Sequence, residues 1–363
     1  MKKKYYDVEK LVKRYPDSHY YVIIGERSNG KTYSVLKYML TQSVKTNTQF
    51  AVIRRWQDDF KGQRGATMFD ALEDNFEIED ITDGQWTNVE YKSNRWYLCR
   101  YDDDGKKTVA EEPIGYAFAI SSMEHDKSTS YPKVNHILFD EFLTRQLYLP
   151  NEFVLFMNTL STIIRQRNNV KIFMCGNTVN QYSPYFSEMG LTHIKQMKPG
   201  DVELYKYGDS ALQVVVEFSD NPNKKKDSDV YFAFNNSHLN MITKGEWDMD
   251  IYPHCPHKYY KEDVLFTYFI QYDGELLQAE IVLKEDVLFT FIHRKTTELQ
   301  DPEHDIIFTP EYNSRPNYNR RITHPTNNIT KKISHTFNDD SVFYQDNEVG
   351  EIVRNYIHWC LKK

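Results

Sequence analysis

Short apolar runs alternate with longer amphipathic stretches over the first half of the chain. Four runs are each of a length typical of one buried strand: 19–25, 49–56, 134–142 and 169–178. Residues 32–44 and 151–167 instead carry apolar side chains at helical spacing, and the second stretch follows Pro150. Two further strands, 94–103 and 114–121, are predicted around a polar turn. Strands that alternate with helices predict an α/β domain with a mostly parallel sheet.

Beyond residue 260 the pattern changes. Residues 263–295 are predicted to form three strands joined by turns at Asp273-Gly274 and at 284–286, which is an antiparallel meander. A final helix is predicted near 347–363. The C-terminal part is therefore predicted to be a separate, small α+β domain.

The length of 363 residues favours two domains. The polar, charged segment that begins at 220 is the candidate linker. We predict a first domain at 1–219, a linker at 220–232 and a second domain at 233–363. Within the linker, Lys224, Lys225 and Lys226 have two interpretations, a solvated hinge or a contact with DNA phosphates.

Composition excludes several classes of protein. No stretch of eighteen apolar residues occurs, so we expect no membrane span, and no apolar run follows the basic N-terminus, so we expect no secretory signal. The four cysteines form no C-x-x-C pair, which favours free thiols in a reducing compartment. The net charge of −7 gives no chain-wide basic footprint for nucleic acid, although a nearly neutral first domain can still present a local basic stripe.

The segment GERSNGKT lies between the first predicted strand and a helix. It fits the phosphate-loop pattern G-x-x-x-x-G-K-[ST]. Its residues are Gly25, Glu26, Arg27, Ser28, Asn29, Gly30, Lys31 and Thr32. In such a loop the backbone N–H groups surround phosphate, Lys31 would reach the β- and γ-phosphates, and Thr32 would place its hydroxyl on Mg²⁺. We therefore predict an ATP site, with a chance loop between strand and helix as the alternative.

Two acids end the buried strand at 134–142. Asp140 can hold Mg²⁺, and Glu141 can polarise an attacking water as a general base. A hydrolysing ATPase needs such a glutamate, whereas a kinase does not. The alternative is an ordinary acidic pair at the end of a strand.

Three further polar residues have two interpretations each. Asn177, after the strand at 169–178, can sense the γ-phosphate or can be a turn residue. Arg165 and Arg167 close the helix at 151–167. Either can stabilise transition-state charge at a neighbouring subunit, or can interact favourably with the helix dipole.

These motifs, in this order, resemble the genome-packaging ATPases of small phi-29-like tailed phages. The resemblance covers residues 15–190 and is carried by the segments at 22–33, 50–56, 126–142 and 149–186. It implies an additional-strand, catalytic-glutamate P-loop ATPase domain with a lid region, and a C-terminal ribonuclease H-like domain. It also implies that ATP hydrolysis drives double-stranded DNA into a prohead.

The resemblance assigns residue roles and partners. Lys31 and Thr32 take the phosphate-loop roles, Asp140 holds Mg²⁺ and Glu141 is catalytic. The arginine offered in trans matches Arg165, and a second cation acting in trans matches Lys127. Arg27 matches an arginine that the family carries inside the loop, and Asn177 falls at the sensor position; all three are implied nucleotide contacts. The implied assembly is a homopentameric ring in the host cytoplasm, transiently at the portal vertex and absent from the mature virion. The portal protein is an implied partner, and a packaging RNA is a further candidate.

Two departures from the relatives matter. A relative has a lysine just after the arginine pair at 54–55, where this chain reads RRWQDD, so that Lys61 and Arg64 are the replacement candidates for gripping DNA. Related large terminases place a catalytic aspartate inside the first nuclease strand. Here that strand, VLFTYFIQY, has no carboxylate, and Asp273 follows it only in the turn. Two-metal cleavage needs several convergent carboxylates, so we expect a vestigial nuclease that binds DNA, portal or RNA.

Three other functions remain as alternatives: a terminase with an active nuclease, a P-loop kinase, and a scaffold that binds nucleotide only for assembly. Cleavage of plasmid DNA would identify the first, and transfer of phosphate to an acceptor would identify the second. A scaffold would be insensitive to Glu141→Gln.

Overall fold

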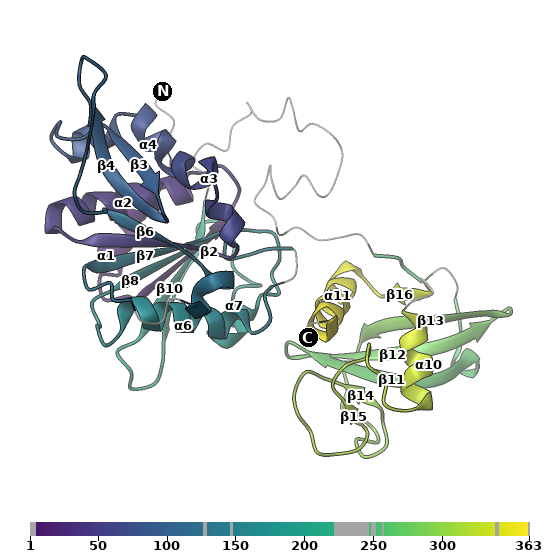
Figure 1. Ribbon diagram of the computed structural model, residues 1–363. Coiled ribbons are helices and arrows are strands. Elements are labelled where there is room, and N and C mark those ends of the chain that lie inside the picture. The colour runs from purple at the N-terminus through teal and green to yellow at the C-terminus, as the bar shows by residue number, and fades with distance from the viewer. Residues whose placement is uncertain are drawn as a thin grey trace. The chain divides into compact units, whose positions relative to one another are not determined.

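The computed structural model describes residues 5–125, 129–145, 148–220, 247, 252–255, 258–337 and 341–361. These residues belong to two compact units, which divide between Asp248 and Met249. Figure 1 shows each unit as a sheet with helices packed on it. The predicted linker at 220–232 lies, apart from Asp220, outside the described residues, so the predicted domain boundaries remain predictions. Within the described ranges, no helix is long and apolar enough to cross a membrane.

A mixed sheet of ten strands forms the centre of the first unit, in the order β3-β4-β6-β2-β7-β8-β1-β10-β9, with β5 paired to β4. The strands are β1 Tyr20–Gly25, β2 Gln49–Arg54, β3 Asn88–Lys92, β4 Arg95–Tyr101, β5 Lys107–Val109, β6 Gly115–Ala119, β7 Val134–Asp140, β8 Lys171–Asn177, β9 Val202–Lys206 and β10 Gln213–Ser219. The neighbours from β6 to β10 pair in parallel, whereas both edges are antiparallel. The predicted parallel arrangement therefore holds for the centre of the sheet only.

Helices cover both faces of this sheet. They are α1 Val8–Arg14, α2 Lys31–Thr46, α3 Gln63–Ala66, α4 Asp70–Asp74, α5 Glu77–Ile81, α6 Glu152–Ile164 and α7 Pro184–Glu188, with short 3-10 turns η1 Gln57–Phe60, η2 Thr67–Phe69 and η3 Ile120–His125. Alternate residues of β1 point to opposite sides. Val22 and Ile24 join the core under α6 and α7, and Tyr21 and Ile23 join the core under α1 and α2. The parallel strands consequently end at one common edge between two cores.

Sequence analysis did not predict β10, which is nevertheless a central strand. Its residues 214–219 pair in parallel with the whole of β1. Its last residue, Ser219, accepts a hydrogen bond from Asn29 Nδ2 (2.8 Å) and donates one to the Ile24 carbonyl oxygen (2.8 Å). The strand thus supports the loop that follows β1 from one side.

The second unit contains a six-stranded sheet in the order β15-β14-β11-β12-β13-β16. Its elements are η5 Lys261–Asp263, β11 Val264–Tyr272, β12 Glu275–Lys284, β13 Val287–Arg294, β14 Ile307–Phe308, β15 Tyr318–Asn319, α10 Asn328–Thr336, β16 Val342–Tyr344 and α11 Asn347–Leu361. The antiparallel meander predicted for β11 to β13 is confirmed. Strands β14 and β16 extend it in parallel on either side, and neither they nor α10 were predicted.

His136 on β7 supplies a stability prediction. Its ring lies edge-on to Tyr38 (5.7 Å) and stacks on Phe173 (6.5 Å), and its Nδ1 has no hydrogen-bond partner among the described residues. Burial and then the charge of Lys171 lower the pKa of His136 to about 4. The unfolded chain therefore binds an extra proton between pH 6.5 and pH 4, and folding stability falls as the pH falls through this window. The loss at pH 4 amounts to about 3 kcal/mol.

His136→Phe is expected to remove that acid sensitivity while leaving stability at pH 7 nearly unchanged. Urea unfolding of both proteins at pH 7 and pH 4.5, followed by tryptophan fluorescence, measures the effect. Equal loss of stability in the two proteins between these pH values would contradict the assignment to His136.

Candidate nucleotide site

The loop between β1 and α2 has the backbone that its glycines predict. Gly25 and Gly30 have φ angles of +151° and +92°, which side chains rarely allow. A Cβ at Gly25 would lie 2.3 Å from Ser219 Oγ. Gly30 is the N-cap of α2, so the helix begins with its N–H groups directed toward the loop. Strand, loop and helix therefore form a cradle suited to an anion.

The residues inside the loop divide by exposure. Arg27 and Ser28 are exposed, whereas Glu26 and Asn29 are buried. Asn29 joins the loop to β10 through Ser219, and its Oδ1 also accepts a hydrogen bond from the Lys31 backbone N–H (3.3 Å). Arg27 and Ser28 thus remain accessible to a ligand, while Asn29 fixes the loop.

Lys31 is buried at the centre of the site. Its Nζ donates to the carbonyl oxygens of Gly25 (3.2 Å) and Glu26 (2.5 Å), and to the side-chain oxygen of Asn177 (3.2 Å). Burial lowers the pKa of Lys31 to about 8. Sequence analysis predicted both Lys31 and Asn177 as nucleotide contacts, and the structure brings their side chains together.

Thr32 and Asp140, the predicted magnesium ligands, also meet. Thr32 Oγ1 donates to Asp140 Oδ1 (2.8 Å), and Asp140 Oδ2 accepts a hydrogen bond from Arg54 Nη2 (2.7 Å). Hydroxyl and carboxylate oxygens are the hard ligands that Mg²⁺ prefers. These two side chains fit that ion, and Arg54 balances the carboxylate charge.

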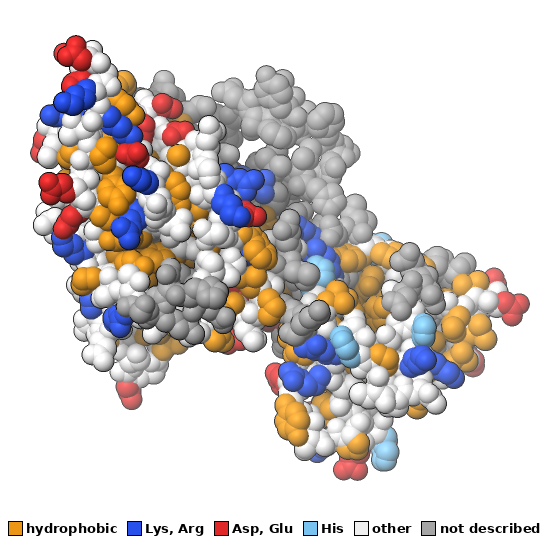
Figure 2. Space-filling model, in the orientation of Figure 1, with side chains coloured by type: hydrophobic (Ala, Val, Ile, Leu, Met, Phe, Trp, Pro, Cys, Tyr) orange, Lys and Arg blue, Asp and Glu red, His pale blue; other side chains and the backbone are white. Residues whose placement is uncertain are grey.

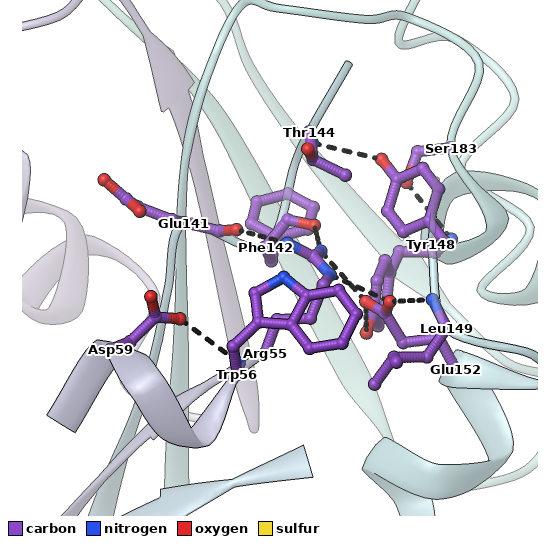
Figure 3. Close-up of polar contacts among 11 residues, drawn as sticks. Arg55, Trp56, Asp59, Glu141, Phe142, Thr144, Tyr148, Leu149, Glu152 and Ser183 are labelled. Atoms are coloured by element: carbon purple, nitrogen blue, oxygen red, sulfur yellow. Dashed lines mark hydrogen bonds and ion pairs between the residues drawn. The ribbon is translucent and has the colours of Figure 1, made fainter. Parts of the chain in front are cut away.

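Glu141 directly follows β7 and is exposed. Its φ angle is +56°, a left-handed conformation that is uncommon for a residue with a side chain. Figure 3 shows the carboxylate pointing away from the buried residues, while the carbonyl oxygen faces Arg55. The acidic pair is therefore split, with Asp140 inside the site and Glu141 free to meet a solvent-borne reactant.

The two arginines after α6 have different surroundings. Arg167 donates to five backbone carbonyl oxygens, including those of Ile163 (2.9 Å) and Val134 (2.6 Å). Arg165 is exposed, and its Nη2 donates a hydrogen bond to the Thr129 carbonyl oxygen (3.1 Å). Arg167 therefore stabilises the loop before β7, whereas the Arg165 side chain remains exposed.

Among the cations predicted to contact DNA, the structure describes Lys61 and Arg64. Lys61 is exposed and pairs with Asp58 (2.6 Å), and Arg64 Nη1 donates to the carbonyl oxygen of the same aspartate (3.2 Å). Exposed ion pairs contribute little, so both cations can exchange this partner for phosphate. On the face of the first unit seen in Figure 2, basic side chains are interspersed with acidic and apolar ones. Lys127, Lys224, Lys225 and Lys226 lie outside the described residues.

Sequence analysis missed the partners of the arginine pair at the end of β2. Arg54 binds Asp140, and the buried Arg55 binds the buried Glu152 through Nε–Oε2 (2.8 Å) and Nη2–Oε1 (2.9 Å). Two adjacent cations that end a buried strand need buried acids as partners, and this was the available signal. The partners themselves are 86 and 97 positions away in the sequence.

Comparison with known proteins is consistent with this site. The family model described as Podovirus DNA encapsidation protein (Gp16) matches residues 1–229. The DNA packaging protein of Bacillus phage B103 is 30% identical over 172 residues, which are 47% of this chain and 47% of that protein. The DNA packaging protein of Bacillus phage phi29 is 28% identical over 167 residues, 45% of this chain and 44% of that protein. The chain thus spans about half the length of these curated relatives.

Two solved structures extend the likeness in fold over nearly the whole chain. The Phi-28 gp11 DNA packaging motor has a TM-score of 0.56 at 18% identity and covers 99% of this chain and 98% of that chain. The bacteriophage Phi-29 viral genome packaging motor assembly has a TM-score of 0.55 at 20% identity and covers 97% and 96%. At these identities the likeness shows a common fold.

Proposed function

This chain belongs to the podovirus DNA encapsidation protein family, and from this premise we propose that it is an ATPase subunit that drives double-stranded DNA into a prohead. One observation carries the proposal. Lys31 and Thr32, which begin the helix after β1, form hydrogen bonds with residues that end two other strands. Lys31 donates to Asn177 at the end of β8, and Thr32 donates to Asp140 at the end of β7. Glu141 stands exposed beside them.

Binding of ATP would use the contacts that the loop already offers. The Lys31 ammonium exchanges the carbonyl oxygens of Gly25 and Glu26 for the β- and γ-phosphates, and Asn177, already bonded to Lys31, reaches the γ-phosphate. Thr32 and Asp140 would hold Mg²⁺, which neutralises phosphate charge when bound. The exposed Arg27 supplies a further cation at the mouth of the loop.

Hydrolysis needs a base and a charge stabiliser. Glu141 takes the proton of the attacking water, because its carboxylate is exposed immediately after Asp140. Arg165 of one subunit stabilises transition-state charge in the next, which makes hydrolysis depend on the neighbour. Lys127 is proposed as a second cation in trans. The position of β8 between β1 and β7 supports the additional-strand class of ATPase.

The second unit is proposed to be a ribonuclease H-like domain that has lost cleavage. Its meander, extended by parallel strands, supports the fold. Strand β11 contains no carboxylate, and Asp273 lies in the following turn. In the part of the chain that the structure describes, no three His, Cys, Asp or Glu side chains are grouped to hold a metal ion. We propose that this unit binds DNA, portal or packaging RNA instead.

The proposed assembly is a homopentameric ring at the portal vertex of the prohead, formed in the host cytoplasm. The related solved structures are named as a packaging motor and a motor assembly, which supports work in a complex. Such a motor must grip any sequence, so its DNA contacts go to phosphates. Lys61 and Arg64 are the described candidates, and Lys224, Lys225 and Lys226 are the others.

Phosphate release by the purified protein, with and without double-stranded DNA, tests the proposed function. We expect release of phosphate from ATP, stimulation by DNA, and no phosphorylated acceptor. If the ring assembles only on the portal, proheads that carry the portal must be added to the assay. Absence of phosphate release with DNA and proheads present would refute the ATPase, and metal-dependent cleavage of plasmid DNA would favour a terminase with an active nuclease.

A further inference from the structure

A buried ion pair lies directly behind the proposed catalytic glutamate. Arg55 and Glu152 are 7% and 2% exposed, and the guanidinium grips both carboxylate oxygens side-on. The Glu152 carboxylate oxygens accept two further hydrogen bonds. Its Oε2 accepts the Leu149 backbone N–H (2.7 Å) and its Oε1 accepts the Tyr185 hydroxyl (2.7 Å). Each partner is therefore fixed from several sides.

The same guanidinium also holds the backbone at Glu141. Arg55 Nη2 donates to the Phe142 carbonyl oxygen (2.7 Å), and Nη1 donates to the Glu141 carbonyl oxygen (3.3 Å). The central carbon of the Arg55 guanidinium lies over the Tyr148 ring, 5.1 Å from the ring centre. Figure 3 shows these contacts around Arg55, with the Glu141 carboxylate directed away from them. One side chain thus links the end of β2, the residues after β7 and the start of α6.

The conformation of Glu141 explains why such a link is needed. A residue with a side chain at φ +56° is strained and persists only where its surroundings determine it. Relaxation to an ordinary conformation would reorient the peptide and redirect the carboxylate. The two carbonyl contacts from Arg55 oppose that rotation, because they require both oxygens to face the buried side.

We propose that Arg55 and Glu152 are a positioning pair for the proposed catalytic Glu141. Arg55 fixes the left-handed peptide that aims the Glu141 carboxylate, and Glu152 fixes Arg55. This inference rests on the proposed ATPase function. A pair kept for stability alone is the competing explanation. Buried ion pairs replaced by apolar residues of similar volume often leave stability unchanged, so the two explanations can be separated.

The test compares three full-length variants with wild type. Arg55→Met/Glu152→Met removes both charges together and leaves no unpaired buried ion. Arg55→Lys keeps the charge opposite Glu152 but lacks the planar fork that reaches Glu141, Phe142 and Glu152 at once. Leu98→Ala, on β4, removes buried packing from the same unit two strands away from β2 and is the control for destabilisation.

Three quantities are measured: the melting temperature, the affinity for a fluorescent ATP analogue, and the single-turnover hydrolysis rate at saturating ATP. A misplaced catalytic group can cost on the order of 10²-fold in rate. We expect the double variant to lose about 10²-fold and Arg55→Lys about 10-fold, both with affinity unchanged within about threefold. Leu98→Ala should hydrolyse at the wild-type rate even where it melts earlier.

If the folded double variant hydrolyses ATP at the wild-type rate, the positioning inference is refuted and the proposed ATPase function still stands. Where that variant does not fold, wild-type hydrolysis by Arg55→Lys overturns it equally. Loss of activity by Leu98→Ala to the same degree would assign the effect to destabilisation and refute positioning. A wild-type protein that hydrolyses no ATP refutes the proposed function, and the inference falls with it.

Discussion

Glu141→Gln is expected to bind ATP with wild-type affinity and to hydrolyse it about 10²- to 10⁴-fold more slowly. The amide preserves the size of the side chain and lacks the carboxylate that accepts a proton. Because the Glu141 side chain is exposed, the substitution should leave the buried packing of the unit unchanged. Phosphate release and binding of a fluorescent ATP analogue, measured on the same protein, separate the two effects.

Glu188→Gln, the same chemical change on α7, is the matched control and should behave as wild type. A Glu141→Gln protein that hydrolyses ATP at the wild-type rate would exclude Glu141 as the base. It would also support the alternative of a nucleotide-binding scaffold, provided that wild type itself releases little phosphate.

Arg165→Ala is expected to reduce hydrolysis by about 10³- to 10⁵-fold, the usual effect of an arginine supplied in trans. Folding should be almost unaffected, because the side chain is exposed and its hydrogen bond reaches the Thr129 carbonyl oxygen at the surface. Rings assembled from wild-type and variant subunits at increasing variant fraction provide the measurement. Coupling between neighbours predicts a loss of activity steeper than the variant fraction.

Two variants of adjacent residues control this experiment. Gln166→Ala changes the next exposed side chain and should leave hydrolysis intact. Arg167→Ala removes five contacts to backbone carbonyl oxygens and should lower the melting temperature, which Arg165→Ala should not do. A strictly proportional loss in the mixed rings would show that each subunit fires independently of its neighbour.

The site was predictable where its chemistry is local in sequence. Lys31 and Thr32 share one loop with fixed spacing, and Asp140 and Glu141 directly follow an apolar strand. Parallel strands end at one edge, so these groups had to meet. The composition of the helix end could not separate Arg165 from Arg167, because only the folded loop before β7 shows which one is engaged.

What the sequence did not reveal depends on distant pairing. Glu152 has the appearance of an ordinary acid in the first turn of a helix, and its role depends on Arg55, 97 positions earlier. Strand β10 was missed because polar sequence flanks it, although its valines join the same two cores as the residues of β1. Its importance comes from Ser219, which reaches the phosphate loop across 190 positions.

Helix α6 spans 13 residues, or about 20 Å, between two ends to which we assign roles. Its first residue, Glu152, is bound through Arg55 to the backbone of the glutamate in its own subunit, and the residue after its last turn is Arg165. In the proposed ring, the helix would act as a lever. A displacement of the Glu141 loop at one nucleotide would move helix α6 as a rigid body, and with it the Arg165 side chain proposed to serve the next subunit. The nucleotide state of one subunit would then affect hydrolysis in the next subunit around the ring, and the coupling would have one direction.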